Sequence, residues 1–274
     1  MLRSLNSAVS GLQQFQEEID VIGNNIANVN TIGFKESRVD FEDTLSQAIG
    51  AGSPSNQVGT GVATAAISTN FNPGTLNTTG VASDLAVSGQ GFFVVQNSAD
   101  QAQFVTRAGD FHVDYNGYLV TPDDLRVQGY SDAGLSAIGD LRIDATGAPS
   151  TAAAGAKMKS WSIDQNGKIN VVLDDGTQFV RGQVLLQNYS NPGALIKEGG
   201  NLYSATTLAG PLAALGVPGT NGLGEIKSGS LEMSNVELTA EMASLITAQR
   251  AFQANARVIT TSDELLQEVA NLKR

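Results

Sequence analysis

Apolar residues recur at helical spacing at the start of the chain. Between Leu2 and Ile26 they lie three or four residues apart, which places them along one face of a helix. The members of this stripe are Leu2, Leu5, Val9, Leu12, Phe15, Ile19, Ile22 and Ile26. The pattern stops at residues 30–33, where Asn and Gly favour non-helical backbone. The first helix is therefore predicted to end near Asn30.

A second helical pattern begins near Ser234. Ser234 and Glu237 fit a capping box, in which each side chain bonds the other residue's backbone amide. The seam that follows is Leu238, Met242, Leu245, Phe252, Ala256, Ile259 and Leu266, interrupted by Gln249 and Asp263. Because no Gly or Pro lies between Met233 and Arg274, a helix of roughly 35 residues and about 50 Å is predicted.

Between the two helices the pattern changes to that of β-structure. Residues 85–95, 104–107 and 183–189 have the composition of strands. Residues 111–120 and 161–170 each alternate apolar and polar positions around an Asn-Gly pair, which predicts hairpins. The segments 145–155 and 205–224 are predicted loops. The expected fold class is α+β, with a long helix at each end and a β-rich central domain.

Each terminal helix has one apolar stripe that it cannot bury alone. Both helices could pack on the β domain as ordinary core helices. Alternatively, they could pair as a coiled coil and pack against copies in neighbouring subunits. Periodicity does not decide between these two arrangements.

Composition and charge exclude several classes of function. The 274-residue chain is 41% hydrophobic and carries a net charge of −11, which disfavours binding to nucleic acid and to anionic membranes. No apolar run approaches the ~20 residues of a membrane span, and the first residues lack a signal-peptide pattern. The chain has no cysteine, so disulfides, thiol catalysis and cysteine metal sites are excluded.

The polar motifs do not indicate catalysis. His112 is the only histidine, which disfavours a zinc site or a triad. The aspartate pairs at 123–124 and 174–175 are typical of turns. Asp114 and Asp164 share fragments with calcium loops but lack the spaced acidic ligands, so hairpin turns are predicted. Residues 89–94 contain two glycines but lack the third glycine and the following helix of a phosphate loop. We predict no catalytic residue, no cofactor and no metal site.

Four ordered blocks carry a family resemblance. They are VIGNNIANVNTIGFK at 21–35, GQGFF at 89–93, TRAGDF with NGYLV at 106–120, and the closing segment from GSLEMSNVE at 229–237 through AQRAFQAN at 248–255 to TTSDE at 260–264. Together they resemble the flagellar rod and hook axial proteins of bacteria. The resemblance covers both ends and the first half of the middle, whereas residues 130–225 match no block.

The resemblance implies that the terminal helices pair and line a hollow helical tube whose outer wall is formed by β domains. The implied domains are 1–32 with 234–274 for assembly, 33–75 as a connecting segment, 76–228 as the outer β domain and 229–233 as a return segment. The expected assembly interface is Leu5, Val9, Leu12, Phe15, Ile19, Ile22, Asn24, Asn25, Ile26, Leu238, Met242, Leu245, Phe252, Ile259 and Leu266. For Asn24, Asn25 and Asn28, helix termination and hydrogen bonding between subunits both stay open.

Within this family, the sequence favours a hook subunit that forms a curved tube transmitting motor torque for motility. Only residues 48–57 separate the block ending at Gln47 from residues 58–62, where distal-rod proteins are expected to carry a longer insertion. The segments 67–71 and 271–274 are also hook-like. The chain length is a departure, because it leaves little room for the further outer domain of many hook proteins.

A distal-rod subunit is the alternative, and a secreted β-domain binding protein is a distant one. The partners implied for a hook are other copies of the chain, distal-rod and hook–filament junction proteins, the export apparatus and the hook cap. The implied location is the extracellular flagellum, reached without a cleaved signal peptide.

Overall fold

A computed structural model describes residues 2–45, 47–48, 57–149, 152, 156–210 and 215–272. The chain separates into two compact units. The helical unit contains Met1–Val29, Lys35–Asn70 and Val236–Arg274, and the β unit contains Asn30–Phe34 and Phe71–Asn235. The chain therefore crosses between the units four times. The domain boundaries predicted from the sequence stay a prediction, and the contacts group residues 35–70 with the helices.

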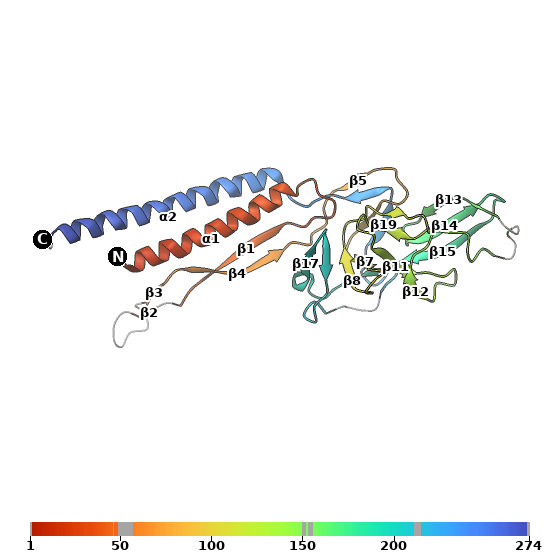
Figure 1. Cartoon of the computed structure of the whole chain (residues 1–274), viewed down its shortest axis with the longest axis horizontal. Helices are drawn as coiled ribbons and strands as arrows, with labels where there is room; N and C mark the ends of the chain where they lie inside the picture. Colours follow the sequence, from red (N-terminus) through yellow and green to blue (C-terminus); the bar gives the residue numbers. More distant parts are fainter. Residues whose placement is uncertain are drawn as a thin grey trace. The chain divides into compact units, whose positions relative to one another are not determined.

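The helical unit consists of two long helices and a β-ribbon (Figure 1). Helix α1 spans Leu2–Ala27 and helix α2 spans Leu238–Leu272. The ribbon pairs β1 (Ser37–Asp43) with β4 (Val62–Thr69) antiparallel, with a bulge between Asp40 and Phe41. A short pair, β2 (Gln47–Ala48) with β3 (Gln57–Val58), follows. In the described residues, neither helix is both long and apolar enough to cross a membrane.

Both predicted helices form, and the 35-residue length of α2 agrees with the prediction. The predicted start of α2 is wrong. Ser234 is buried in the β unit, and the helix begins at Leu238, where the carbonyl of Glu237 accepts the first intrahelical bond from Glu241. The capping-box pattern at 234–237 therefore places the start of α2 too early.

The β unit is built on an antiparallel sheet. In the described residues its main path is β13-β14-β15-β11-β7-β8-β18-β17, and β9, β10, β12 and β16 join it at the side. Two further pairs, β19 with β6 and β20 with β5, complete the unit. The bounds are β5 Leu76–Thr78, β6 Leu85–Ser88, β7 Phe92–Gln96, β8 Gln103–Thr106, β9 His112–Val113, β10 Leu119–Val120, β11 Arg126–Tyr130, β12 Ile138–Asp140, β13 Met158–Ile163, β14 Lys168–Leu173, β15 Gln178–Val184, β16 Leu186–Gln187, β17 Ile196–Gly199, β18 Leu202–Ser204, β19 Glu225–Ser228 and β20 Ser230–Glu232, with a short 3-10 helix at Pro192–Ala194.

The hairpins predicted around the two Asn-Gly pairs are confirmed. Strands β9 and β10 pair across the first turn, and β13 and β14 pair across the second. In each turn the glycine amide donates to the backbone carbonyl of the aspartate three residues earlier, Gly117 to Asp114 and Gly167 to Asp164. The alternation of β14 follows from its pairing, because Ile169, Val171 and Leu173 are fully buried while their neighbours are not.

Apolar residues on the sheet form two core clusters. The larger contains Leu85, Val87, Phe93, Val95, Phe111, Leu119, Leu125, Val127, Leu141, Ile143, Ile163, Ile169, Val171, Leu173, Val184, Leu186 and Ile226. The smaller gathers aromatic side chains edge to face, with Phe92 against Phe71, Tyr189 and Tyr203.

The β unit contains a fully buried ion pair. Arg107 Nη1 is 3.4 Å from Glu232 Oε2, and both side chains have no solvent exposure. The other carboxylate oxygen of Glu232 accepts the Gly74 amide at 2.9 Å, and its carbonyl accepts the Gly33 amide at 2.8 Å. Glu232 therefore holds together three segments that lie far apart in the sequence.

Candidate assembly interface

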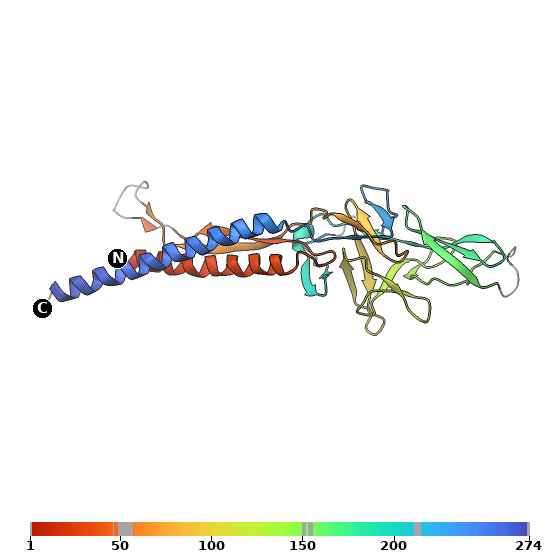
Figure 2. The ribbon, with the colours of Figure 1, turned by 90° about the horizontal axis from the view of Figure 1, so that it is seen from above.

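The two helices of the helical unit run antiparallel. Asn25 hydrogen-bonds with Glu241, and a Cβ atom added to Gly11 would lie 2.7 Å from Asn255 Nδ2. In both pairs the two residue numbers add up to 266. Residues later in α1 therefore face residues earlier in α2, as in an antiparallel pair. Figure 2 shows the helices side by side from above, with both chain termini at the same end of the pair.

The seam of α2 against α1 has heptad spacing. Its members are Glu241, Leu245, Ala248, Phe252, Asn255, Ile259 and Ser262, and the same spacing continues to Leu266. Ala248 and Ser262 are buried, and the others are half-buried. The facing positions of α1 include Ala8, Gly11 and Ile22, which are buried. Small residues at these positions let the two backbones approach closely, as in a coiled coil.

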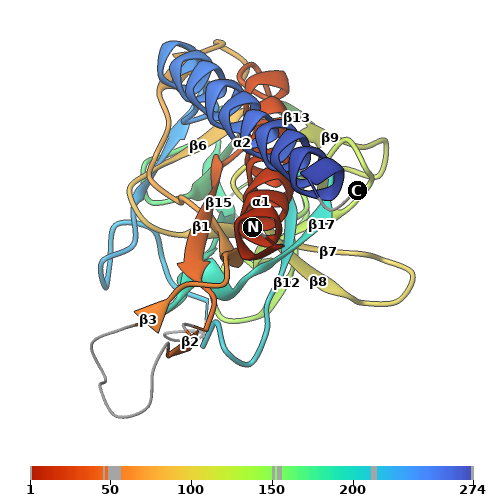
Figure 3. The same cartoon turned by 90° about the vertical axis from the view of Figure 1, so that its left-hand side faces the viewer.

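A second side of α1 is covered by the β1–β4 ribbon. Seen end on in Figure 3, α1 lies between α2 and β1. The Thr64 hydroxyl donates to Gln14 and Glu17, and the Val62 amide reaches the Ser10 hydroxyl at 3.4 Å. The Phe15 ring meets Phe41 edge to face at 6.1 Å. Helix α1 is therefore held on two sides within the chain.

Asn25 connects α1, α2 and β1. Its side chain is 1% exposed, donates to the Ser37 carbonyl at 2.8 Å and accepts the Ser37 amide at 3.0 Å. With these two bonds the Asn25 side-chain amide pairs with the backbone of Ser37 as a residue of a neighbouring strand would. The third bond, to Glu241, ties the same side chain to α2. Helix termination alone does not account for Asn25, and its role between subunits stays a prediction.

A small polar cavity of about 110 Å³ lies beside Asn25. It is lined by Glu18, Val21, Ile22, Asn25, Ser37, Arg38, Val39, Glu241 and Ser244. Burial raises the pKa of Glu241, the charge of Glu36 raises it further, and the bond from Asn25 lowers it. Burial also raises the pKa of Glu18. Glu241 Oε2 is buried with no hydrogen-bond partner among the described residues.

The structure distributes the predicted interface residues over three environments. Ile22 and Asn25 are buried. Leu5, Leu12, Phe15, Ile19, Ile26, Leu245, Phe252, Ile259 and Leu266 are half-buried. Val9, Asn24, Leu238 and Met242 are exposed. The half-buried and exposed apolar residues have surface left to bury, and their role between subunits stays a prediction.

The sequence pattern missed two groups of residues. The small or polar seam residues Ala8 and Gly11 of α1 and Ala248, Asn255 and Ser262 of α2 are not part of the apolar pattern. The three on α2 nevertheless have heptad spacing with Leu245 and Phe252. Five exposed apolar residues of α2 were also missed, and they are Ile246, Val258, Leu265, Val269 and Leu272.

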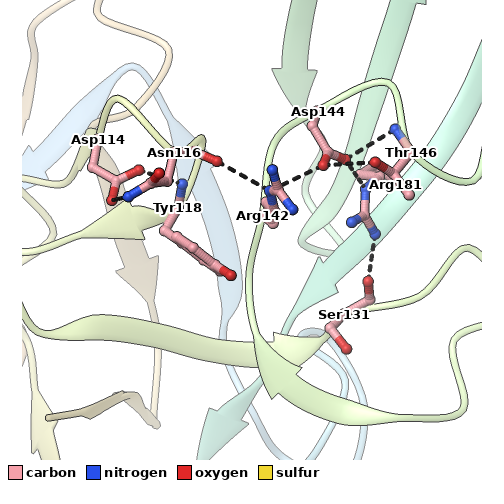
Figure 4. Close-up of polar contacts among 8 residues, drawn as sticks. All are labelled: Asp114, Asn116, Tyr118, Ser131, Arg142, Asp144, Thr146 and Arg181. Carbon is pink, nitrogen blue, oxygen red and sulfur yellow. Dashed lines mark hydrogen bonds and ion pairs between the residues drawn. The ribbon is translucent and has the colours of Figure 1, made fainter. Parts of the chain in front are cut away.

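Polar side chains in the β unit close loops. Figure 4 shows Asp114 accepting the Tyr118 amide at 2.7 Å, so the segment that shares fragments with calcium loops is held by its own backbone. Asp144 contacts Arg142 at 3.0 Å and Arg181 at 2.6 Å. Burial alone would raise the pKa of Asp144, but bonds from Arg181 and Thr146 outweigh it and lower the pKa.

The described residues of the β unit do not assemble a recognisable reactive centre. Among them, no three His, Cys, Asp or Glu side chains could hold a metal ion together. His112 is exposed. A cavity of about 370 Å³ is lined in part by Thr106, Asp110, Asp123 and Asn201. Burial raises the pKa of Asp110, partly offset by its own amide, and Asp84 and Asp123 raise it further.

Comparison with known proteins identifies the class. Residues 5–35 match the model for flagella basal body rod proteins, residues 86–171 match the D1 domain of the flagellar hook proteins FlgE/F/G, and residues 227–272 match the C-terminal segment of the flagellar basal body rod FlgEFG proteins. The matched segments include the terminal helices and part of the β unit.

Full-length relatives are also found. The flagellar basal-body rod protein FlgG of Bacillus subtilis is 43% identical over 100% of both chains, and that of Borreliella burgdorferi is 35% identical over 100% of both. The flagellar hook protein FlgE of Borreliella burgdorferi is 30% identical over an alignment of 444 positions. A solved hook protein, FlgE2 of Helicobacter pylori, aligns with 48% of this chain and 38% of its own at 15% identity, with a TM-score of only 0.24.

These matches define a structural protein of the axis of the bacterial flagellum, and not an enzyme. The chain belongs to the FlgE/F/G family of flagellar basal-body rod and hook proteins.

Proposed function

We propose that the protein is a subunit of the distal rod, the straight part of the flagellar axis. The observation that carries this proposal is the full-length match to rod proteins at 43% and 35% identity. The hook protein FlgE aligns at 30%, and its alignment extends to 444 positions against the 274 residues of this chain. A hook of that kind therefore contains segments for which this chain has no counterpart.

The hook interpretation is the weaker alternative. It depended on the hook-like segments 67–71 and 271–274 and on the shortness of residues 48–57, most of which lie outside the described residues. The full-length relatives favour the rod, so a short segment at this place does not distinguish the two kinds of subunit. The hook cap and the hook–filament junction proteins are partners only under the hook alternative.

The helical unit supplies the means of assembly in this proposal. Within one subunit α1 is covered by α2 and by the ribbon, but Val9, Leu238 and Met242 keep between 38% and 45% of their surface exposed. Burying such apolar surface against further copies is favourable, at about 25 cal/mol per Å². The partners we propose are other copies of the chain and the adjoining flagellar axial proteins, in a basal body reached through the flagellar export apparatus.

Genetic rescue and electron microscopy test this function together. The gene is expressed in a bacterium that lacks its own distal-rod protein and, separately, in one that lacks its hook protein. We expect recovery of rods in the first strain only, and straight tubes from the concentrated purified protein. Curved tubes, or rescue of the hook-deficient strain alone, would restore the hook interpretation.

A further inference from the structure

Asn-Gly pairs occur in three turns of the β unit. They are 116–117, 166–167 and 221–222, and in each pair the asparagine is exposed to solvent. An asparagine before glycine readily loses its side-chain amide, because the backbone nitrogen of the glycine can attack the side-chain carbonyl carbon and no Cβ atom hinders the approach. The attack requires the peptide group between the two residues to rotate. The restraints on that peptide group therefore decide which pair reacts.

In the first pair, this peptide group is bonded at both ends. The Gly117 nitrogen donates to the Asp114 carbonyl at 3.0 Å, and the Asn116 carbonyl accepts a bond from Arg142 Nε at 3.0 Å (Figure 4). The glycine is also packed closely, since a Cβ atom added to Gly117 would lie 2.9 Å from the Ile143 carbonyl oxygen. Attack by this nitrogen would require the turn to open.

The second pair is held in the same way. The Gly167 nitrogen donates to the Asp164 carbonyl at 2.9 Å, and the Asn166 carbonyl accepts a bond from Gln183 Nε2 at 2.7 Å. A Cβ atom added to Gly167 would lie 2.8 Å from the Val184 carbonyl oxygen. These two turns therefore protect their asparagines, although both asparagines are exposed.

The third pair has none of these restraints. Among the described residues, neither the Asn221 carbonyl nor the Gly222 nitrogen has a hydrogen-bond partner. A Cβ atom added to Gly222 would meet no atom within 4 Å. The turn is closed outside the pair, where the Leu223 amide donates to the Thr220 carbonyl at 2.9 Å. The peptide group between Asn221 and Gly222 can therefore rotate without losing a hydrogen bond of its own.

We propose that Asn221 is a site of covalent modification, by deamidation through a succinimide. The Gly222 nitrogen bonds to Asn221 Cγ and closes a five-membered ring. The side-chain nitrogen leaves as ammonia, with the proton of the Gly222 amide transferred to it through solvent. Water then opens the ring at either carbonyl and gives aspartate or isoaspartate. The net change exchanges NH2 for OH with water as the only co-reactant, and it adds one negative charge to a chain of net charge −11.

The isoaspartate product changes the turn as well as its charge. Its main chain runs through the former side chain, so an extra methylene group lies between Thr220 and Leu223. Leu223 is half-buried against the larger core cluster. It also fits closely beside two glycines, because a Cβ atom would lie 3.2 Å from its side chain at Gly91 and 2.5 Å at Gly216. The longer turn displaces Leu223 from this position, whereas aspartate leaves the main chain unchanged.

Peptide mapping by mass spectrometry measures the three sites in one sample. Trypsin cleaves after lysine and arginine, which places Asn116, Asn166 and Asn221 in the separate peptides 108–126, 160–168 and 198–227. The full chain is kept folded in mildly alkaline buffer, and the deamidated fraction of each peptide is followed over time. We expect Asn221 to react at least about tenfold faster than the other two, roughly the factor that one hydrogen bond of ordinary net strength supplies.

Incubation in urea is the control for intrinsic reactivity, because unfolding removes all three turns. The three rates should then become similar. Asn221→Gln should remove most of the isoaspartate formed by the folded protein, since glutamine would have to close a larger ring. Asn166→Gln is the matched variant and should leave the isoaspartate yield unchanged. Both variants keep an uncharged amide at an exposed position.

A second measurement tests the effect on the turn. Asn221→Asp adds the charge alone and should unfold at the midpoint temperature of the unmodified protein, whereas the isoaspartate-containing fraction should unfold at a lower one. Equal midpoints would overturn the displacement of Leu223.

The rates in the folded chain decide the site itself. Equal rates at the three asparagines, or reaction of Asn116 or Asn166 ahead of Asn221, would overturn the inference. It would also be overturned if Asn221 reacted in urea and stayed unchanged in the folded chain. These rates concern the single chain, so they test the site whether the protein is a subunit of the rod or of the hook.

Discussion

At the scale of single residues, the family blocks are explained by close backbone contacts. Gly33 has a φ of +68°, and a Cβ atom there would lie 2.5 Å from the Ala108 backbone nitrogen. Its amide donates to Glu232, the buried partner of Arg107. Two blocks that lie 70 residues apart in the sequence therefore meet at one point of the β unit. Their residues serve this packing and not a chemical reaction.

Replacing Gly33 with alanine should destabilise the β unit by two separate effects. The left-handed backbone costs about 1–2 kcal/mol, and the overlap with Ala108 adds roughly 2 kcal/mol because backbone atoms cannot move aside. Gly176→Ala is the matched control, since Gly176 has a φ of +85° but no atom within 4 Å of its added Cβ. Urea unfolding followed by the fluorescence of Trp161, the only tryptophan, measures both. If Gly33→Ala and Gly176→Ala lost the same free energy of unfolding, the overlap with Ala108 would contribute nothing, which would contradict the second effect.

At the scale of elements, the sequence predicted whichever features have a strong local signal. The apolar spacing from Leu5 to Ile26 predicted α1, and the Asn-Gly pairs predicted two hairpins. The start of α2 was wrong because a capping box is only a local preference, and Ser234 is instead buried in the β unit. The order of the strands could not be predicted, since β7 pairs with β8, β11 and β16 across up to 95 residues of chain, the separation of Phe92 and Gln187.

The contacts within the helical unit were predicted in part, for a similar reason. Apolar periodicity identifies a stripe but not what covers it. Helix α1 has three sides with different surroundings, and the seam against α2 uses Ala8 and Gly11, which a search for large apolar residues passes over. The asparagine at 25 was recognised as polar, but its bonds to Ser37 require a strand that only the fold brings near.

Glu241→Gln should stabilise the helix pair at neutral pH. Burial raises the pKa of Glu241 above its usual 4.5, so the folded state prefers the protonated form. A raised carboxyl pKa contributes stability below the unfolded value, and this contribution is lost as pH rises through the folded value. At pH 7 the ionised carboxylate therefore weakens the pairing, and glutamine, which keeps an acceptor for Asn25, removes that cost.

Thermal unfolding followed by circular dichroism at pH 7 and pH 4 measures this effect. The gain in midpoint temperature should be present at pH 7 and shrink towards pH 4, where the wild-type carboxyl becomes protonated. Glu264→Gln, on the exposed side of the same helix, is the control and should change little. A lower midpoint for Glu241→Gln at pH 7 would mean that the charge itself holds the helices together.

At the scale of the whole molecule, assembly must overcome like charge. Each copy carries a net charge of −11, so copies repel one another while their exposed apolar residues attract. Salt weakens only the repulsion, because the Debye length falls from about 30 Å at 0.01 M to about 10 Å at 0.1 M ionic strength. We therefore expect the critical concentration for polymerisation to fall as NaCl is raised over this range.

Sedimentation of the polymer at a series of protein concentrations measures that dependence. Replacing Asp123 and Asp124, both exposed in the β unit, with asparagine removes two negative charges and should flatten the response to salt. Because neither residue belongs to the helical unit, the variant should still polymerise into the same tubes. A critical concentration that rises with salt would instead mean that ion pairs between copies, and not the exposed apolar residues, supply most of the attraction.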